Sequence, residues 1–580
     1  MNDKNGKFVI DKSKDGYYVA KINKDGKSIY LGSRYNMKRE LENFLDACNN
    51  LEDEKARFII FGFGSGEHIK ILRKRYINNK IRVFEPNVEI FKYAIKLEYV
   101  KNDENLEVIN YSNKDFFADN FINEFNLHRI KIVKFSNYDK VYPQHFVKLL
   151  NQIKDFYVHM RIERNTKYLF SKRWFETLIN NIINVPEAML FDELKGAYKN
   201  KPAIIVSAGP SLDKNIDLLK GIEDEFLIIT GGRPLKGILE KNIGAQLLVT
   251  IDPSEDNFKL FEDCVGEEKI PLLFFDVTNE KIVQKHKGDK LFSAYNEMFS
   301  DIFGCNIELL ETYGSVAHTM VSSALLLGCN PIIFIGQDFA YTGDRAHSPY
   351  LEEKHNDNNF EEIKRNNDIW VEDINGGLVR TSVELNDFKI GMEKIIEKNP
   401  NTIFINATEG GARMKGTLEM SLSDTIKKYR GSNVKKIVCK KHEKEYLEKI
   451  LKALKPIRDE LITIEKECTK GLLYIKELKN IYKFGDINRI DAILSKMEKV
   501  DKKILNKLNS FHIIEDLLYP IAYEVLVNSN IDNENNKKTK VKYIIEQNFN
   551  LYSNLNLAIK DSLEPIDNAI NILKNKKVRS

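Results

Sequence analysis

The residues best suited to chemistry follow a short apolar run at residues 203–206. Gly209 and Pro210 turn the chain there, and Ser211 is a residue type that commonly caps the N-terminus of a helix. We expect the helix over residues 212–220. Backbone N–H groups beside the positive end of a helix bind phosphate. The pattern predicts a nucleotide or sugar-nucleotide site, and a glycine turn that only reverses the chain is the alternative.

The elements around this turn predict a mostly parallel sheet. The apolar run at 203–206 indicates a strand buried on both faces. Similar runs alternate with helical stretches, which is the pattern of α/β proteins. In such sheets, ligands bind beyond the carboxyl ends of the strands. Most of the runs are followed there by a polar or glycine-containing turn, and they lie at residues 226–230, 246–251, 271–276, 331–336 and 402–406.

Two further turns carry candidate groups. Asp252 follows the run at 246–251, so its carboxylate is expected at a strand end. It either binds a ribose or sugar hydroxyl or caps the next helix. Gly314 and Ser315 precede an apolar helix expected over residues 316–327. They offer a second helix N-terminus for a phosphate, and simple helix capping is the alternative.

Four blocks of the middle region resemble the central domain of the motility accessory factors. They are residues 201–216, 250–255 (TIDPSE), 313–348 and 404–417. This family comprises bacterial flagellin glycosyltransferases that are related to bacterial sialyltransferases. The resemblance implies a CMP-activated nonulosonic (sialic-acid-like) sugar as donor and flagellin as acceptor. It also implies a metal-independent mechanism with no required cofactor, and the region has no convincing DxD motif.

The resemblance implies roles for individual residues. Asp338 orients the donor sugar, and His347 accepts the proton of the acceptor hydroxyl. Glu409 is a second candidate base or a ligand of a donor hydroxyl. Tyr341 hydrogen-bonds the leaving phosphate, and Arg413 grips the sugar carboxylate. For all five, an ordinary turn or loop residue is the alternative. The donor-binding set is Ser207, Gly209, Pro210, Ser211, Gly231, Gly232, Asp252, Gly314, Ser315, Thr319, Gln337, Tyr341, Asn406 and Arg413.

The N-terminal third has a pattern of its own. Residues 7–32 predict a hairpin with its turn at 24–26. A strand at 58–61 then leads into a GxGxG turn, and the next strand ends at Glu85. A glycine turn with an acidic residue about 20 positions on is typical of ribose or S-adenosylmethionine binding. Glycines that serve only the turn are the reading we favour, because no clear catalytic set follows, and methyl transfer is the alternative. The domain boundary falls near residues 164–186, where we expect an amphipathic connecting helix.

The C-terminal part is expected to be helical. From residue 445 apolar residues recur at spacings of three and four, and Pro456 is expected to kink or break the first helix. We therefore expect three domains with an overall α/β fold. They are a hairpin with a Rossmann-like domain at 1–165, a sialyltransferase-like parallel α/β domain at 166–432, and an all-α bundle at 433–580.

The composition of the chain excludes several classes of binding partner. The 580 residues carry a net charge of only +4, which does not predict a nucleic-acid partner. The six cysteines are scattered, which indicates reduced thiols and no metal site. No signal peptide is evident and no apolar run approaches the ~20 residues of a membrane helix, so we expect a cytoplasmic protein without a membrane partner.

Two rival functions stay open. The resemblance extends to archaeal pterin pyrophosphokinases, so a diphosphate transfer that uses ATP and magnesium is the enzymatic rival. The other rival is a flagellin-binding chaperone whose central domain catalyses no reaction. The sequence leaves open which nonulosonic acid is used, the stereochemical outcome and the oligomeric state.

Overall fold

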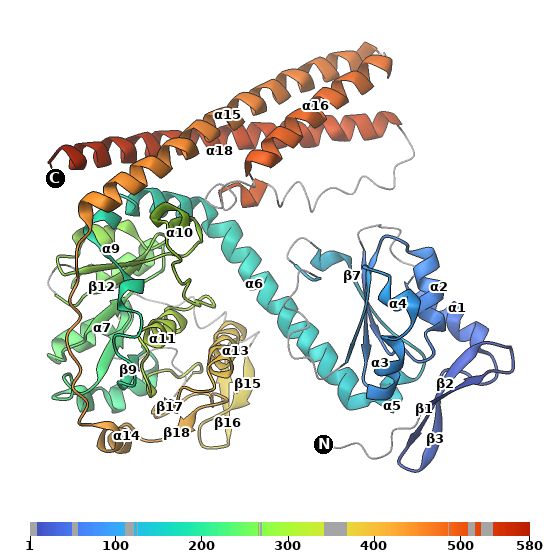
Figure 1. Cartoon of the computed structure of the whole chain (residues 1–580), viewed down its shortest axis with the longest axis horizontal. Helices are drawn as coiled ribbons and strands as arrows, with labels where there is room; N and C mark the ends of the chain where they lie inside the picture. Colours follow the sequence, from blue (N-terminus) through green and yellow to red (C-terminus); the bar gives the residue numbers. More distant parts are fainter. Residues whose placement is uncertain are drawn as a thin grey trace. The chain divides into compact units, whose positions relative to one another are not determined.

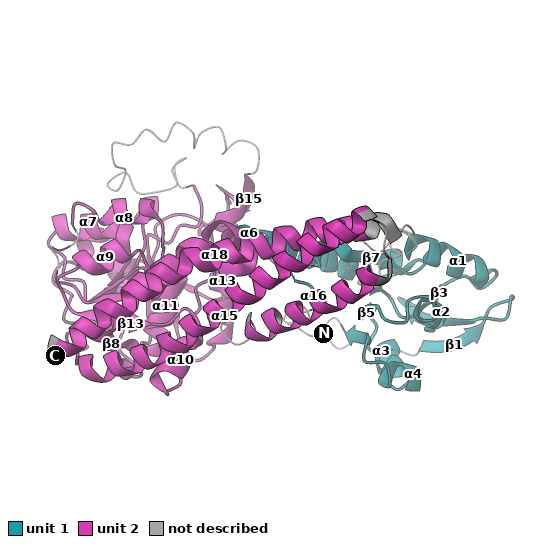
Figure 2. Ribbon diagram, turned by 90° about the horizontal axis from the view of Figure 1, so that it is seen from above, with its two compact units in different colours: residues 1–165, 523–535 teal, residues 166–522, 536–580 magenta. Residues whose placement is uncertain are grey.

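The computed structural model describes residues 8–48, 56–110, 121–123, 126–264, 266, 269–341, 368–484, 487–508, 517–521, 523 and 537–579. The chain forms two compact units, shown in two colours in Figure 2. Unit 1 comprises residues 1–165 and 523–535, and unit 2 comprises residues 166–522 and 536–580. The long helix α6 (Pro143–Asn181) contributes residues to both.

Unit 1 combines an antiparallel sheet with a parallel one. Strands β1, β2 and β3 form the first, and the hairpin turn expected at residues 24–26 is confirmed between β2 and β3. The second sheet has the order β6-β5-β4-β7, and its strands are parallel. The elements are β1 (Phe8–Lys12), β2 (Tyr18–Lys24), β3 (Lys27–Leu31), α1 (Met37–Cys48), β4 (Arg57–Phe61), α2 (Glu67–Arg75), β5 (Lys80–Glu85), α3 (Val88–Ala94), α4 (Glu98–Lys101), β6 (Leu106–Asn110), β7 (Ile130–Lys134) and α5 (Tyr138–Val141).

Unit 2 is built on the expected parallel sheet, whose order is β18-β17-β14-β9-β10-β11-β12-β13-β8. All six expected strands are present, and the sheet also contains β8, β13 and β18, which the sequence patterns did not indicate. The strands are β8 (Met189–Leu190), β9 (Ala203–Val206), β10 (Leu227–Thr230), β11 (Leu247–Val249), β12 (Leu272–Phe275), β13 (Lys290–Ser293), β14 (Ile332–Ile335), β17 (Phe404–Asn406) and β18 (Leu418–Glu419). A separate hairpin pairs β15 (Ile369–Glu372) with β16 (Leu378–Thr381).

Helices cover both faces of this sheet (Figure 1). Alternate residues of β9 face opposite ways, so Ile205 belongs to the buried cluster that contains Met320 of α11, and Ile204 belongs to the cluster that contains Ile238 of α7. Burial on both faces explains why these strands are continuous apolar runs. The helices between the strands are α7 (Gly232–Glu240), α8 (Glu255–Phe261), α9 (Glu280–Lys285), α10 (Met298–Phe303), α11 (Val316–Leu326), α13 (Val383–Lys398) and α14 (Leu422–Tyr429).

The helical C-terminal part shares a hydrophobic core with the sheet domain. Helices α15 (Glu443–Phe484), α16 (Ile487–Leu508) and α18 (Lys537–Arg579) run alongside one another (Figures 1 and 2). Leu454 of α15 and Phe274 of β12 belong to one cluster of buried residues, so residues 433–522 and 536–580 belong to the same unit as residues 166–432. Helix α15 continues through Pro456, so the break expected there is absent.

Candidate functional site

The site is a cavity of about 600 Å³ in unit 2. It is lined by residues that follow β9, β10, β11 and β14, which are neighbours in the sheet. The chain proceeds outward from β9 through β10 and β11, then returns to place β14 on the other side of β9. This reversal leaves a crevice at the carboxyl ends of the strands, which is the usual ligand position in open α/β sheets.

Nine of the predicted site residues line the cavity. They come from turns far apart in the sequence and are Ser207, Gly209, Gly231, Gly232, Asp252, Gly314, Ser315, Gln337 and Asp338. Ser207 and Gln337 join the two central strands, because the Ser207 hydroxyl donates a hydrogen bond of 2.6 Å to the Gln337 Oε1. The sequence pattern therefore identified the carboxyl ends of the strands, where the cavity lies. The roles of these residues in donor binding stay predictions.

The Gly209 turn differs from its expected form. The helix expected over 212–220 is two short 3-10 segments, Pro210–Lys214 and Ile216–Leu219, and Ser211 lies inside the first of them instead of capping a helix. The Ser211 hydroxyl donates to Asp338 Oδ1 at 2.5 Å and its backbone N–H to Asp338 Oδ2 at 3.1 Å. These donors are engaged within the protein, so the turn does not present them to a phosphate.

Asp338 joins three segments of the fold. Its carboxylate binds Ser211, and its backbone oxygen accepts a hydrogen bond of 2.7 Å from the N–H of Ala412. A Cβ added at Gly209 would overlap the Asp338 carboxylate, and one added at Gly411 would overlap its backbone. The side chain is 2% exposed. This packing makes Asp338 a structural link, and the contacts on its carboxylate leave its predicted role in orienting the sugar without support from the geometry.

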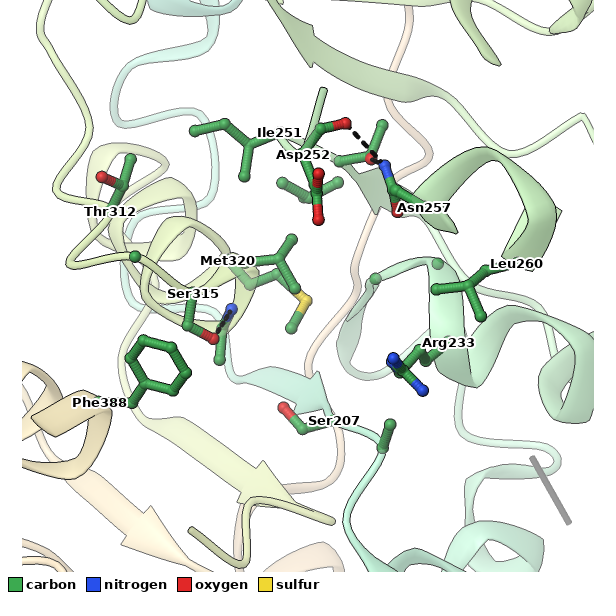
Figure 3. A pocket seen from close by; sticks show the side chains of 18 of the residues that line it. Ser207, Arg233, Ile251, Asp252, Asn257, Leu260, Thr312, Ser315, Met320 and Phe388 are labelled. Atoms are coloured by element: carbon green, nitrogen blue, oxygen red, sulfur yellow. Dashed lines mark hydrogen bonds between the residues drawn. The ribbon is translucent and has the colours of Figure 1, made fainter. Parts of the chain in front are cut away.

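The first turn of α7 is the open helix N-terminus of the cavity. Gly231 is the N-cap and no side chain caps the helix. Gly232 must lack a side chain, because a Cβ there would overlap the ring of Phe261. The exposed side chain of Arg233 follows and extends into the cavity (Figure 3). This end of α7 therefore combines a helix dipole with a guanidinium charge, which favours an anion.

The N-terminus of α11 is capped from within. The Ser315 hydroxyl accepts a hydrogen bond from the N–H of Ala317 at 3.4 Å, as the capping alternative predicted. Deeper in the same helix, His318 is buried and donates from Nε2 to the carbonyl of Phe388 at 2.7 Å. Burial lowers the pKa of His318 below its ordinary 6.5. His318 is thus a structural residue that links α11 to α13.

Asp252 projects from the end of β11 into the cavity (Figure 3). Its Oδ1 accepts a hydrogen bond from the N–H of Ser254 at 2.8 Å, and its backbone oxygen accepts one from Asn257 Nδ2 at 2.9 Å. Ser254, not Asp252, is the N-cap of α8, since the Ser254 hydroxyl accepts from the N–H of Asn257. The exposed Asp252 carboxylate is therefore placed to accept hydrogen bonds from ligand hydroxyls.

The other predicted residues that the structure describes do not line the cavity. Asn406 is buried against Glu419, and Arg413 pairs with Glu372 at 3.0 Å. Glu409 is exposed at a turn that binds Lys214 through its backbone. Pro210, Ser211, Thr319 and Tyr341 are buried outside the lining. His347 lies outside the described residues, so its role as the base stays a prediction.

The structure adds groups that the sequence patterns did not single out. Arg233 occupies the α7 turn, and Thr166, Phe170 and Trp174 of α6 form one wall. From the sequence, this region was expected only as an amphipathic connecting helix. Only the proximity of α6 to the carboxyl end of β11 reveals that this face lines a cavity.

The glycine turn of unit 1 is filled by the protein's own side chains. Glu85 is fully buried, and its carboxylate accepts hydrogen bonds from the backbone N–H groups of Phe63 and Asn87 and from the hydroxyl of Tyr138. Burial raises the pKa of Glu85 to about 7. The Tyr138 ring packs so closely on Gly62 that a Cβ there would overlap it. The acidic residue thus stabilises its own turn, which supports the structural alternative.

No group of three or more His, Cys, Asp or Glu residues that could hold a metal ion occurs in the part of the chain that the structure describes. Within the same residues, no helix is both long and apolar enough to cross a membrane. The six cysteines, all described, form no disulfide bond.

Comparison with known proteins agrees with this architecture. Residues 176–344 match the family model for 6-hydroxymethylpterin diphosphokinase MptE-like proteins. The solved structure of the MAf glycosyltransferase from Magnetospirillum magneticum AMB-1 superposes with a TM-score of 0.55 at 15% identity, over 99% of this chain and 95% of that one. No curated protein matches the sequence. The chain is therefore an α/β protein with an MptE-like central domain. The expected resemblance to the motility accessory factors is confirmed for the fold.

Proposed function

We propose that the protein is a glycosyltransferase that moves a nonulosonic acid from its CMP-activated form to Ser or Thr of flagellin. The observation that carries the proposal is the cavity at the carboxyl ends of β9, β10 and β11. It brings the open end of α7, the charge of Arg233 and the carboxylate of Asp252 to one space. Its volume of about 600 Å³ suits a ligand of nucleotide size.

In this proposal the donor phosphate binds at the first turn of α7. The turn of Gly231 and Gly232 lets the phosphate approach the backbone, and Arg233 adds a full positive charge. As the sugar–phosphate bond breaks, negative charge grows on the leaving CMP. Fixed donors and charges placed there stabilise it more than they stabilise the bound donor. The α7 turn takes the place of the Gly209 turn that we expected from the sequence.

The carboxylate of Asp252 then accepts a hydrogen bond from a ribose or sugar hydroxyl. Its position is fixed by Ser254 and Asn257, so it approaches the ligand without first having to be ordered. The hydroxyl of the acceptor Ser or Thr must lose a proton during transfer. We keep His347 as the proposed acceptor of that proton.

The test is intact-mass analysis of flagellin co-expressed with the protein and a CMP-nonulosonate pathway. The wild type should add sugar-sized mass increments to flagellin. Arg233→Met should lower the modified fraction at least tenfold, because it removes a charge that faces the leaving phosphate. Lys236→Met, on the same helix but outside the cavity lining, is the matched control and should behave as wild type. Unmodified flagellin that still co-purifies would favour the chaperone reading instead.

A diphosphate transfer is the second candidate, because the MptE-like family model includes the turns after β9, β10, β11 and β14 that line the cavity. It predicts that the protein transfers diphosphate from ATP to 6-hydroxymethylpterin and needs magnesium. Incubation with both substrates, with and without magnesium, followed by mass spectrometry of the pterin, separates this reaction from sugar transfer. A magnesium-dependent gain of two phosphates, without sugar on flagellin, would overturn the glycosyltransferase proposal.

A further inference from the structure

We propose that Trp174 and Phe170 of α6 form a platform on which the base of the nucleotide donor stacks. This inference rests on the proposed function, since it concerns the nucleoside end of the same donor. It assigns donor affinity to a helix that precedes the sheet domain and that the sequence marked only as a connection.

The platform is one face of α6. Thr166, Phe170 and Trp174 follow one another at intervals of four residues, so they lie on the same side of the helix, and all three line the cavity. The next turn of the helix is instead buried in the core through Phe175 and Leu178. Helix α6 therefore changes from core packing to cavity lining within a few residues.

Three aromatic rings adjoin one another at this wall. The centroids of Phe170 and Trp174 are 6.3 Å apart, and their planes differ by 24°. Tyr295 adjoins Trp174 with centroids 5.9 Å apart and planes at 44°. All three side chains are only half buried. A large aromatic surface thus stays open on the cavity, where another planar ring can cover it.

Arg173, next to Trp174, fixes the position of the platform relative to Asp252. Arg173 Nε donates a hydrogen bond of 3.0 Å to the carbonyl of Pro253, the residue after Asp252. Its guanidinium also pairs with Glu280 at 2.7 Å and with Glu255 at 3.5 Å. These contacts link α6 to the loop that carries Asp252, so the aromatic surface and the carboxylate keep a fixed spacing.

The cavity then has three distinct parts. They are an aromatic wall on α6, the Asp252 carboxylate that can accept a hydrogen bond from a ligand hydroxyl, and the positive end at Arg233. A ligand that contacts all of them has a planar ring, a hydroxylated part and a negative group, which describes a nucleotide. Stacking on an aromatic face tolerates any base. The platform should therefore add affinity for CMP and UMP alike, and the choice between them should arise elsewhere.

The chain offers its own reporter, because its two tryptophans are Trp174 and Trp370. Trp370 lies on β15, is 64% exposed and does not line the cavity. In the full-length Trp370→Phe variant, Trp174 is the sole tryptophan. CMP should quench its fluorescence with a saturating curve, and the dissociation constant should match that from calorimetry on the wild type.

Substitution tests the energy of the contact. Trp174→Leu should weaken CMP and UMP binding by similar factors of about 5 to 150, the range of base–aromatic stacking. Trp174→Phe should retain most of the affinity, since a smaller ring still stacks. Phe170→Leu gives a second, independent variant should Trp174→Leu lower the thermal transition of the protein.

The outcomes separate this inference from the proposed function. If CMP binds the wild type but neither quenches Trp174 nor binds the Trp174→Leu and Phe170→Leu variants less tightly, the platform is wrong and the donor site stands. If CMP does not bind the wild type by calorimetry, the proposed donor is wrong and the platform falls with it.

Discussion

Replacing Asp338 by alanine tests whether this carboxylate builds the fold or serves the reaction. Asp338 is 2% exposed and accepts two hydrogen bonds from Ser211, at 2.5 and 3.1 Å. Each hydrogen bond to a charged group contributes about 1.5–3 kcal/mol, and its loss here leaves buried donors unsatisfied. We expect Asp338→Ala to lower the free energy of unfolding by about 3–5 kcal/mol, allowing for incomplete additivity.

Urea unfolding followed by tryptophan fluorescence measures this change, because both tryptophans lie in unit 2. Asp338→Asn keeps one oxygen that can accept from Ser211, so it should lose less than the alanine variant. Asp338→Ala and Ser211→Ala should also be strongly non-additive in combination, since they break the same pair. If Asp338→Ala abolishes sugar transfer while the unfolding curve is unchanged, the carboxylate serves the reaction and our structural reasoning is refuted.

Three other substitutions or conditions follow from the structure. Gly232→Ala places a Cβ in the ring of Phe261, so it should cost about 1–3 kcal/mol and weaken CMP binding, and Phe261→Leu should restore part of both in calorimetry. The pKa of Glu85 is raised to about 7 in the folded protein from an ordinary value of 4.5, so the stability of unit 1 should fall as the pH rises between those values, by up to about 3 kcal/mol. Calorimetric scans at pH 4.5 and pH 7.5 should show this fall for the wild type, and a Glu85→Gln variant with an unchanged fall would contradict it. His318 should change the stability of unit 2 with pH in the opposite direction, because burial lowers its pKa. The unfolded chain takes up a proton near pH 6.5 that folded His318 does not. The unit 2 transition should therefore move down as the pH falls from 7 to 5, and a His318→Gln variant should show a smaller displacement.

The strands of unit 2 were predictable because each is buried on both faces. Such strands are uninterrupted apolar runs, and the run at residues 203–206 coincides with β9. The helix expected at 212–220 failed for a tertiary reason. Ser211 bonds Asp338, which lies far along the chain, and this contact favours a tight 3-10 turn over a capped helix. No local pattern contains that information.

The sequence predicted where in the sheet the site lies, but it did not single out Arg233 and Trp174, on which the proposals depend. In the sequence, Arg233 looks like an ordinary residue of a first helical turn, and Trp174 looks like part of an amphipathic helix. The local pattern accounts for both residue types without a binding site. That both residues line the same cavity becomes evident only from the sheet order, which places β10 and β11 side by side. Asn406 and Arg413 show the converse. Asn406 is the last residue of β17 and Arg413 follows that strand, and β17 is separated by β14 and β9 from β10, the strand that leads into α7.

The position of β9 in the sheet has a consequence for synthesis. It pairs with β10 on one side and β14 on the other, and β14 begins only at Ile332. A nascent chain that has formed β9 to β13 therefore presents β9 as an apolar open edge until β14 arrives. The core around β12 stays incomplete longer still, since Leu454 and Tyr552, which pack in it, belong to the last helices to emerge. A chain stopped after residue 442 should thus expose this core and aggregate instead of folding into a smaller domain.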